Sequence, residues 1–324
     1  MKIQHLGRDG QSISIATPAK INLFFELLGK RSDGFHEIET VMSTVSLFDD
    51  IQFSARSDGQ LKLGIFKQGC TATEHIPTDH SNLILKSMLL LRERFGSPDL
   101  GCEVFLRKRI PSAAGLGGAS GNAAGAILAA NRIWKLGLSL EELKSVAAEI
   151  GSDVPFFLVG GTCCCTGRGE VIESKEVPAG MAIVIAKPGE GLSTAAVYGK
   201  CTLPPQSKRA DAILQHLQDG RWSDVGRNLF NRLESFAKSM TPRIGKLKEM
   251  FDRLNCVGHQ MSGSGTSYFG IFRNAADAHR AAKIATRETG NTIFACSTLG
   301  QERAFQALVG RDSGDNGWRL RKSE

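Results

Sequence analysis

Four closely spaced glycines could let an anion approach main-chain amides: Gly115, Gly117, Gly118 and Gly121. A stretch rich in Ala, Ile and Leu follows and predicts a helix over 122–136. Glycine has no Cβ, so it accepts turns that exclude other residues and leaves room for a ligand. Unpaired amides and the helix dipole both attract anions at a helix N-terminus. The segment therefore predicts a phosphate site, the alternative being a loop whose glycines only form turns.

This first glycine loop matches neither of two common phosphate-binding signatures. It lacks the Gly-Lys-Ser/Thr ending of a Walker A loop. Counting from Gly115, the pattern Gly-x-Gly-x-x-Gly fails at Ser120. A dinucleotide-binding loop is also expected near the start of its domain, whereas more than 100 residues precede this one.

Two charged residues in apolar surroundings are candidates for chemistry. Lys20 interrupts the apolar run Pro-Ala-Lys-Ile-Asn-Leu, and Asp153 directly precedes Val-Pro-Phe-Phe-Leu. Burial of an unpaired charge is unfavourable, so each group needs a partner. Taken alone, either is more often half of a structural ion pair than a catalytic group. A second glycine motif, Met261–Thr266, precedes a strand-like segment.

These residues need elements to position them, and the patterns predict both strands and helices. Apolar and alternating segments predict strands, and capping residues predict the helix starts. Strands and helices that do not alternate regularly favour an α+β fold. We expect a domain over 1–175, a second over 176–300 and a flexible tail over 301–324. The predicted strands cover 13–17, 18–28, 40–47, 104–106, 163–165, 181–186 and 267–272, and the predicted helices cover 83–95, 140–150 and 242–254.

Composition limits the class of protein. The 324 residues are 41% hydrophobic and 23% charged, with a formal net charge of +7, values ordinary for a globular chain. The basic residues are scattered and aromatic residues rarely accompany them, so we expect no nucleic-acid partner. No signal peptide or membrane span is recognised, which favours the cytoplasm. The eight cysteines form no Cys-x-x-Cys pair, so we expect no metal site and read Cys163–Cys165 as buried apolar residues. The sequence does not indicate an oligomeric state.

Together the motifs resemble those of the small-molecule kinase superfamily named for galactokinase, homoserine kinase, mevalonate kinase and phosphomevalonate kinase. The resemblance spans about residues 13–300, in the same order along the chain. The Asp-Gly-Phe-His motif and the segments around Lys20 and Asp153 are similar to those of one branch. That branch phosphorylates a cytidine diphosphate alcohol of the non-mevalonate isoprenoid pathway. The segments that carry the resemblance are Ala19–Leu23, Gly29–Arg31, Asp33–Glu37, Ile110–Gly118, Ser152–Phe157 and Met261–Gly265.

The resemblance implies a two-domain α+β fold with the active site in the cleft between the domains. It implies transfer of a phosphoryl group from ATP, with Mg²⁺, to the 2-hydroxyl of the alcohol substrate. Asp153 would take the proton from that hydroxyl. Lys20 would keep Asp153 ionised and steady the charge that develops on the γ-phosphoryl group. Such catalysis depends mostly on positioning and electrostatics.

By the same resemblance, ATP binds along the first glycine loop. Ala119 stands where the family usually has glycine, and Gly121 stands where serine is usual. Ser120 is then the hydroxyl that remains close to the phosphates. The residues implied at the phosphates are Pro111, Ser112, Ala113, Ala114, Gly115, Leu116, Gly117, Gly118, Ala119, Ser120 and Gly121, and those near adenine are Asn82 and Leu83.

Five residues are implied at the alcohol substrate. Phe35, often tyrosine in the family, would stack on cytosine, and His36 would hydrogen-bond to it. Without the matched motif, His36 would be read as an ordinary surface histidine. Asn22 would line the pocket, and the amides of Gly263 and Gly265 would lie against substrate phosphates.

Two other functions remain possible at this point. A homoserine or mevalonate kinase would share the glycine loop, but its substrate carries no pyrimidine for Phe35 and His36. A nucleotide- or RNA-binding protein without activity would fit the positive net charge, and its RNA affinity would fall steeply with salt. Lys20 and Asp153 argue against this second alternative.

Overall fold

The computed structural model describes residues 12–68, 76–189, 191–309 and 311–312. The strands in these ranges are β1 (Ser12–Lys30), β2 (His36–Arg56), β3 (Leu61–Lys67), β4 (Gly101–Lys108), β5 (Thr162–Thr166), β6 (Val171–Lys175), β7 (Ala182–Lys187), β8 (Phe230–Asn231), β9 (Gly258–Met261), β10 (Tyr268–Phe272), β11 (Thr292–Ser297) and β12 (Arg311–Asp312). The helices are α1 (Leu83–Phe95), α2 (Gly118–Ile133), α3 (Leu140–Ile150), α4 (Val154–Val159), α5 (Thr194–Gly199), α6 (Asp211–Gln218), α7 (Trp222–Arg227), α8 (Leu233–Met240), α9 (Pro242–Arg253), α10 (Ala275–Glu288) and α11 (Gln301–Val309).

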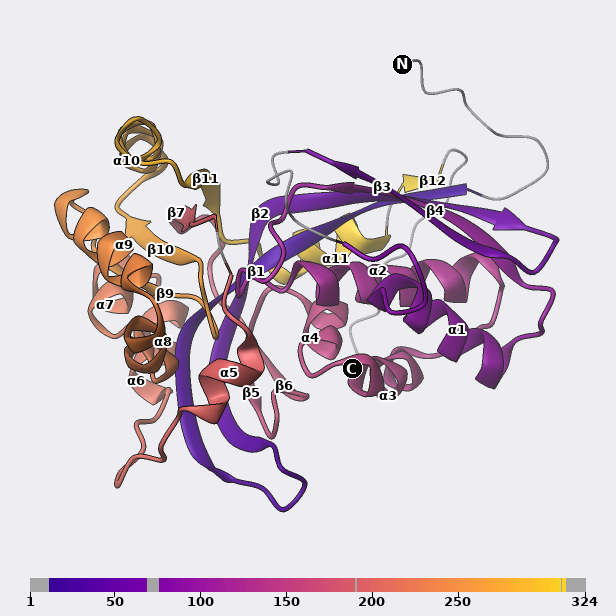
Figure 1. The fold of residues 1–324 in the computed structure, drawn as a ribbon, viewed down its shortest axis with the longest axis horizontal. Coiled ribbons are helices and arrows are strands. Elements are labelled where there is room, and N and C mark those ends of the chain that lie inside the picture. The colour runs from indigo at the N-terminus through magenta and orange to yellow at the C-terminus, as the bar shows by residue number, and fades with distance from the viewer. Residues whose placement is uncertain (1–11, 69–75, 190, 310, 313–324) are drawn as a thin grey trace.

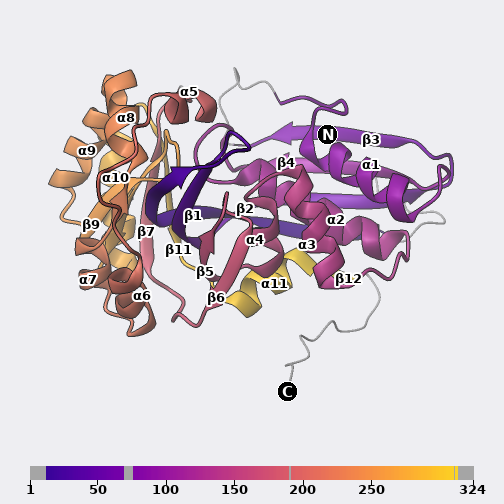
Figure 2. The same cartoon turned by 90° about the horizontal axis from the view of Figure 1, so that it is seen from below.

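Two lobes lie side by side and share the long strands β1 and β2 (Figure 1). One lobe packs α1 to α4 against the sheet that contains β1 to β4. The other holds α5 to α10 around the sheet of β7 and β9 to β11, and the view from below shows the same division (Figure 2). Helices and mainly antiparallel sheets confirm the predicted α+β fold.

The first sheet has the order β12-β1-β2-β4-β3, with β5 on β2 and β8 on β1. Its central strands are far longer than predicted: β1 joins the two strands expected on either side of Pro18, and β2 extends from 36 to 56. Pro18 is accommodated because the pairing of β1 with β2 shifts register between Pro18 and Ala19. A second register shift follows between Asn22 and Phe24. Bulges of this kind bend a strand and re-aim its side chains, often beside functional sites.

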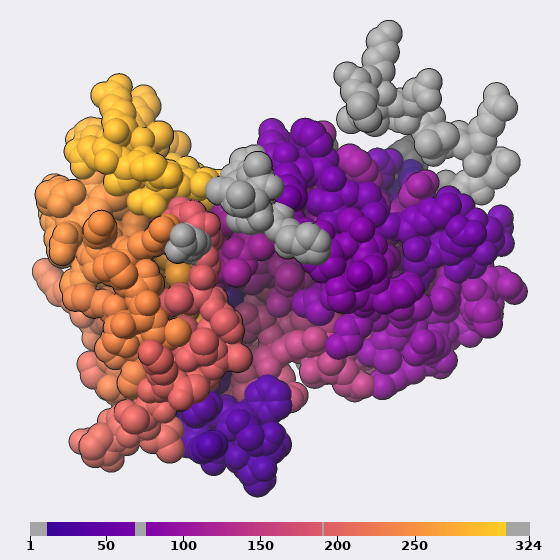
Figure 3. Space-filling view, viewed as in Figure 1, coloured from indigo at the N-terminus to yellow at the C-terminus, as the bar shows by residue number. Residues whose placement is uncertain are grey.

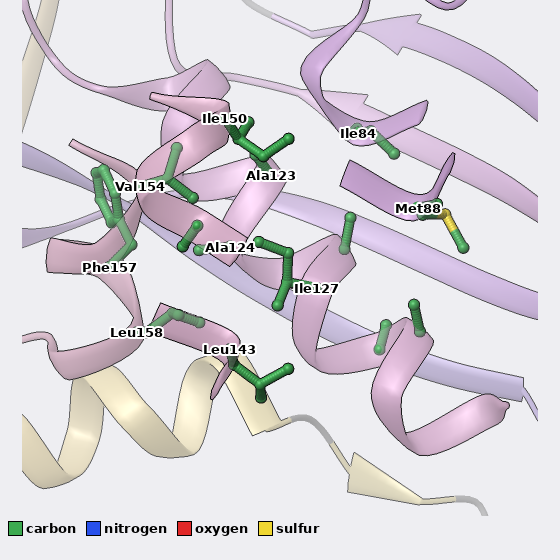
Figure 4. Packing of buried hydrophobic residues seen from close by; sticks show 14 of the residues in the cluster. Ile84, Met88, Ala123, Ala124, Ile127, Leu143, Ile150, Val154, Phe157 and Leu158 are labelled. Atoms are coloured by element: carbon green, nitrogen blue, oxygen red, sulfur yellow. The ribbon is translucent and has the colours of Figure 1, made fainter. Parts of the chain in front are cut away.

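The core of the first lobe depends on small residues in α2. Ala123, Ala124 and Ile127 are fully buried and face α1, α3 and α4 in one continuous apolar cluster (Figure 4). A Cβ on Gly125 would lie 2.6 Å from Cδ1 of Ile15, so only glycine lets α2 approach β1 this closely. Such close contact of helix and strand sets the position of the glycine loop that precedes α2.

The second sheet has the order β11-β7-β10-β9, and its two faces contact different partners. Side chains alternate along a strand. In β7, Ile183 and Ile185 therefore face a cluster shared with β1 and α6, whereas Val184 packs in the cluster beneath α9 and α10. Sheet membership changes between β6 and β7, where the predicted domain boundary near residue 176 lies. That boundary stays a prediction.

Capping residues predicted several helix ends correctly. Asn82 caps α1, Ser139 forms a capping box with Glu142 at α3, and Thr241 caps α9 with proline in the first turn. The helix expected over 122–136 is α2, which begins four residues earlier and ends at Ile133. Glycines lowered the expected helix propensity of its first turn, but packing against β1 overrides propensity there.

Residues 301–309 were expected to belong to a flexible tail and instead form α11. Ala304 and Leu308 are buried, because α11 packs against α2, α4 and β1. The rest of that tail lies outside the described residues, apart from β12. Cys163, Cys164 and Cys165 are buried in β5, as predicted. Within the described ranges, no helix has both the length and the apolar character needed to cross a membrane.

Candidate active site

The fold brings Lys20 and Asp153 together. Nζ of Lys20 lies 3.6 Å from Oδ2 of Asp153, and the two side chains are 5% and 36% exposed. Asp153 is the residue before α4, and its side chain makes no capping hydrogen bond to that helix. In the part of the chain that the structure describes, it accepts no hydrogen bond. The pair therefore presents an accessible carboxylate backed by a buried ammonium group.

Asn22 fixes the position of the ammonium group. It lies two residues after Lys20 on the same face of β1, and its Oδ1 accepts a 2.6 Å hydrogen bond from Lys20 Nζ. Nδ2 of Asn22 donates in turn to Oγ1 of Thr40 on β2, at 2.8 Å. Because both ends of the amide are engaged, its orientation is determined, and so is the place of Lys20.

The first glycine loop packs directly on Lys20. The Lys20 amide donates to the carbonyl oxygen of Leu116 at 2.9 Å. Gly117 has a φ of +68°, and a Cβ there would lie 2.9 Å from Cγ of Lys20 and 2.7 Å from Cζ of Phe157. Both the backbone conformation and the space require glycine. The loop, Lys20 and α4 thus form one packed unit at the N-terminus of α2.

The second glycine motif closes the same site from the other lobe. Ser262 donates through Oγ to the carbonyl oxygen of Gly115 at 2.9 Å. A Cβ on Gly263 would lie 3.1 Å from Oδ1 of Asn22 and 3.3 Å from Nζ of Lys20. The Gly265 amide donates to the Ser262 carbonyl oxygen within the loop. The structure therefore brings together the predicted Lys20, Asn22, Asp153 and both glycine loops, and Figure 3 shows the surface hollowed between the lobes that supply them.

A buried ion pair holds the start of the first glycine loop, and sequence reasoning missed it. Oδ1 of Asp49 accepts the amides of Arg109 and Ile110 at 2.7 and 2.8 Å. Its Oδ2 accepts from Nζ of Lys108 at 2.5 Å. Asp49 is fully buried, and a Cβ on Gly118 would come within 2.8 Å of Lys108 Nζ. The pair therefore ties β2 to β4 and to Arg109 and Ile110, which lead into the first glycine loop, and it packs beside Gly118.

The predicted cytosine-binding residues lie on the turn between β1 and β2. The Phe35 amide donates to Oδ1 of Asp33 at 3.1 Å, which lowers the pKa of that carboxyl and fixes the turn. Phe35 is 49% exposed, and the guanidinium of Arg168 lies 4.9 Å from its ring centroid. His36 packs against Tyr198 with ring centroids 5.4 Å apart. Burial, followed by the charge of Lys30, lowers the pKa of His36, so its imidazole is neutral at pH 7.

Helix α5 links this aromatic group to the second glycine motif. Tyr198 reaches His36, while Oγ1 of Thr194 lies 2.8 Å from Oγ of Ser264. Thr194 and Tyr198 are four residues apart and share one face of α5. Neither was predicted, because a six-residue helix gives too short an apolar pattern, although the capping Ser193 could have marked its start.

Asn82 and Leu83 lie at the start of α1. Oδ1 of Asn82 accepts the amide of Ile84, and its Nδ2 donates to the carbonyl oxygen of Pro77. One end of this side chain therefore caps the helix, and the other holds the loop that precedes it. Among the contacts of the described residues, none joins Asn82 to the Lys20–Asp153 pair, and its place near adenine stays a prediction.

Comparison with known proteins agrees with this arrangement. The profile of the GHMP kinases N terminal domain matches residues 82–161, and that of the GHMP kinases C terminal matches 211–292. The chain is 40% identical over 266 residues to the 4-diphosphocytidyl-2-C-methyl-D-erythritol kinase of Caldicellulosiruptor saccharolyticus, covering 82% of this chain and 89% of the relative. It is 38% identical to the same kinase from Brevibacillus brevis, covering 83% and 90%.

Solved structures give the same result. A crystal structure of 4-(cytidine 5'-diphospho)-2C-methyl-D-erythritol kinase superposes with a TM-score of 0.74 at 30% identity, over 89% of this chain and all of that one. Homoserine kinase from Cytophaga hutchinsonii reaches a TM-score of 0.70 at 19% identity, over 93% of this chain and 98% of its own, which shows the shared fold. The chain belongs to the 4-diphosphocytidyl-2-C-methyl-D-erythritol kinase family, within the GHMP kinases.

Proposed function

We propose that the chain transfers the γ-phosphoryl group of ATP to the 2-hydroxyl of 4-diphosphocytidyl-2-C-methyl-D-erythritol, in isoprenoid precursor synthesis by the non-mevalonate pathway. The products are the 2-phosphate and ADP. The observation that carries the proposal is the Lys20–Asp153 pair, 3.6 Å apart where the two glycine loops meet. The Asp153 side chain is 36% exposed, so its carboxylate can reach an alcohol bound beside the loops.

In the proposed reaction Asp153 accepts the proton of the 2-hydroxyl while the hydroxyl oxygen forms a bond to the γ-phosphorus of ATP. The bond from that phosphorus to the ADP oxygen breaks, so ADP carries away the electron pair. The Lys20 ammonium, held by Asn22, offsets negative charge on the transferring group. It is already oriented before substrate binds, so little reorganisation is needed during the step.

The first glycine loop, from Pro111 to Gly121, is proposed to hold the ATP phosphates. Its fit rests on Gly117, whose missing Cβ lets the loop at the α2 N-terminus pack against Lys20 and Phe157, and on Ser120 in the first turn of that helix. Mg²⁺ bound with ATP would neutralise phosphate charge. Such an ion commonly takes few protein ligands and keeps phosphate and water oxygens.

Recognition of cytosine is assigned to Phe35 and His36. The exposed Phe35 ring offers a face for stacking. The neutral His36 ring has one donor and one acceptor nitrogen, which suits the edge of a pyrimidine. Tyr198 supports His36 from α5. We further propose a cytoplasmic location, which suits the free thiols of the described cysteines.

The test is phosphoryl transfer from ATP, with Mg²⁺, to 4-diphosphocytidyl-2-C-methyl-D-erythritol, beside homoserine and mevalonate. We expect selective phosphorylation of the cytidine compound. Phosphorylation of homoserine or mevalonate alone would still agree with a small-molecule kinase of this superfamily, but it would rule out cytosine recognition by Phe35 and His36. No transfer to any of the three would contradict the proposed reaction.

A further inference from the structure

A second cavity lies between β1, β8, the start of α6 and the end of α7. Its volume is about 130 Å³. That is roughly four water volumes, since water occupies about 30 Å³ in the liquid, and it suits one or two phosphoryl groups. Phe24 and Phe230 form its apolar walls. Lys208, Arg209 and Arg227 also line it, and none of the described residues that line it is acidic.

This cavity is separate from the glycine loops. Phe230 and Asn231 are consecutive in β8, and successive side chains of a strand point to opposite faces. Phe230 lines the cavity. Nδ2 of Asn231 donates instead to the carbonyl oxygens of Met261 and Gly263, both at 2.8 Å, on the side of the second glycine motif. A ligand in the cavity would therefore not occupy the phosphate site of the proposed reaction.

The cations around the cavity differ in how far carboxylates neutralise them. Arg232, behind Phe230, makes a two-pronged ion pair with the buried Glu26. Nε of Arg209 lies 3.3 Å from Oε2 of Glu39, and its side chain is 61% exposed.

The other two lining cations differ in their partners. Arg227 pairs with Asp224 on its own helix, but its side chain is 74% exposed. Nζ of Lys208 lies 4.3 Å from the ring centroid of Phe230, and within the described ranges no carboxylate pairs with it. The Phe230 ring thus holds an ammonium group in place without neutralising its charge.

We propose that this cavity is a second anion site, which takes a phosphate or diphosphate group between Lys208, Arg227 and Arg209. Such oxygens would gain charge-assisted hydrogen bonds from Lys208, and from the donors of Arg209 and Arg227 that their pairs with Glu39 and Asp224 leave over. The small volume selects the anionic group itself rather than a whole nucleotide.

The test is calorimetric titration of inorganic pyrophosphate into the full chain, previously saturated with a non-hydrolysable ATP analogue. The analogue fills the first glycine loop and gives its own isotherm, so failure of the proposed kinase function would be recognised separately. We expect saturable binding to the wild type. Lys208→Met should weaken it at least about tenfold, which equals about 1.4 kcal/mol. Arg227→Gln should act in the same direction, and neither change touches a buried ion pair.

Lys283→Met is the matched control, because Lys283 is an exposed lysine on α10, outside the cavity. Pyrophosphate affinity should stay unchanged in this variant. The proposal is wrong if the analogue-filled wild type shows no saturable binding, or if Lys208→Met binds as tightly as the wild type. An equal loss in Lys283→Met would show a general charge effect and also overturn it.

Discussion

The chemistry at the scale of single residues depends on a carboxylate that the fold leaves open. Asp153 has the Lys20 ammonium 3.6 Å away and no other described partner, so its charge is available to a substrate proton. Lys20 is more constrained, since Asn22 and the first glycine loop both hold it. An accessible Asp153 beside a fixed Lys20 ammonium suits a general base whose charge is stabilised by a neighbouring cation.

Replacing Asp153 by Asn should reduce kcat by about two orders of magnitude or more, because the amide has nearly the same shape but accepts no proton at neutral pH. Lys20 keeps its 2.6 Å hydrogen bond to Asn22, so the loop should stay in place. Calorimetry should then show ATP binding close to that of the wild type. Unchanged turnover would remove Asp153 from the mechanism.

His36→Ala should raise the KM for the cytidine substrate by about tenfold or more, the effect of one lost hydrogen bond to a bound group. The KM for ATP should change little, because His36 contacts Tyr198 and none of its described contacts is to a glycine loop. Steady-state kinetics with each substrate varied in turn gives both values. Equal effects on the two would argue against the pyrimidine assignment.

Binding of the cytidine substrate should also depend on pH. Burial lowers the pKa of His36 below its ordinary 6.5, so the neutral ring persists as pH falls to that value and protonates only below it. We expect the KM for the cytidine substrate to be level from pH 8 to about 6.5 and to rise at lower pH. In His36→Ala this rise should disappear. A rise that persists in the variant would assign the titration to another group.

At the scale of elements, capping residues and alternation gave correct predictions where the signal is local. Asn82, Ser139 and Thr241 marked three helix starts. Long-range packing was not predictable in this way, because no local pattern shows that β1 continues through Pro18 or that α11 packs on α2. The Asp49–Lys108 pair was missed for the same reason: its residues lie 59 apart and meet only in the folded sheet.

The N-terminus of α2 tests how tightly one element positions the site. Gly117→Ala places a Cβ 2.7 Å from Phe157 and 2.9 Å from Lys20, at a φ of +68°. The backbone conformation alone should lower the free energy of unfolding by about 1–2 kcal/mol. The clash should displace Lys20 as well, so kcat should fall strongly.

Gly137→Ala is the control for that substitution. Gly137 has a φ of +70°, but a Cβ there would meet nothing within 4 Å. In chemical denaturation, Gly137→Ala should lower the free energy of unfolding by the same amount, about 1–2 kcal/mol, while kcat stays unchanged. Similar kcat values in the two variants would mean that contact with Lys20 does not matter for turnover.

At the scale of the whole molecule, one apolar cluster joins the lobes. Ala19 and Ile21 of β1 pack in the same cluster as Ile183 and Ile185 of β7 and Ile213 of α6. Because β1 and β2 also supply the catalytic Lys20 and the turn that carries His36, the lobes cannot lose this cluster without loss of the site. We therefore expect the two lobes to unfold together.

Ile183→Ala tests this coupling, because Ile183 is fully buried in the shared cluster. Truncation should lower the free energy of unfolding by about 2–5 kcal/mol, through lost burial and the cavity left behind. Hydrogen exchange measured across a denaturant series should show α2 in one lobe and α10 in the other losing protection at one common midpoint, shifted equally by the variant. Separate midpoints, with only α10 responding, would show that the lobes are independent folding units and that β1 and β2 merely connect them.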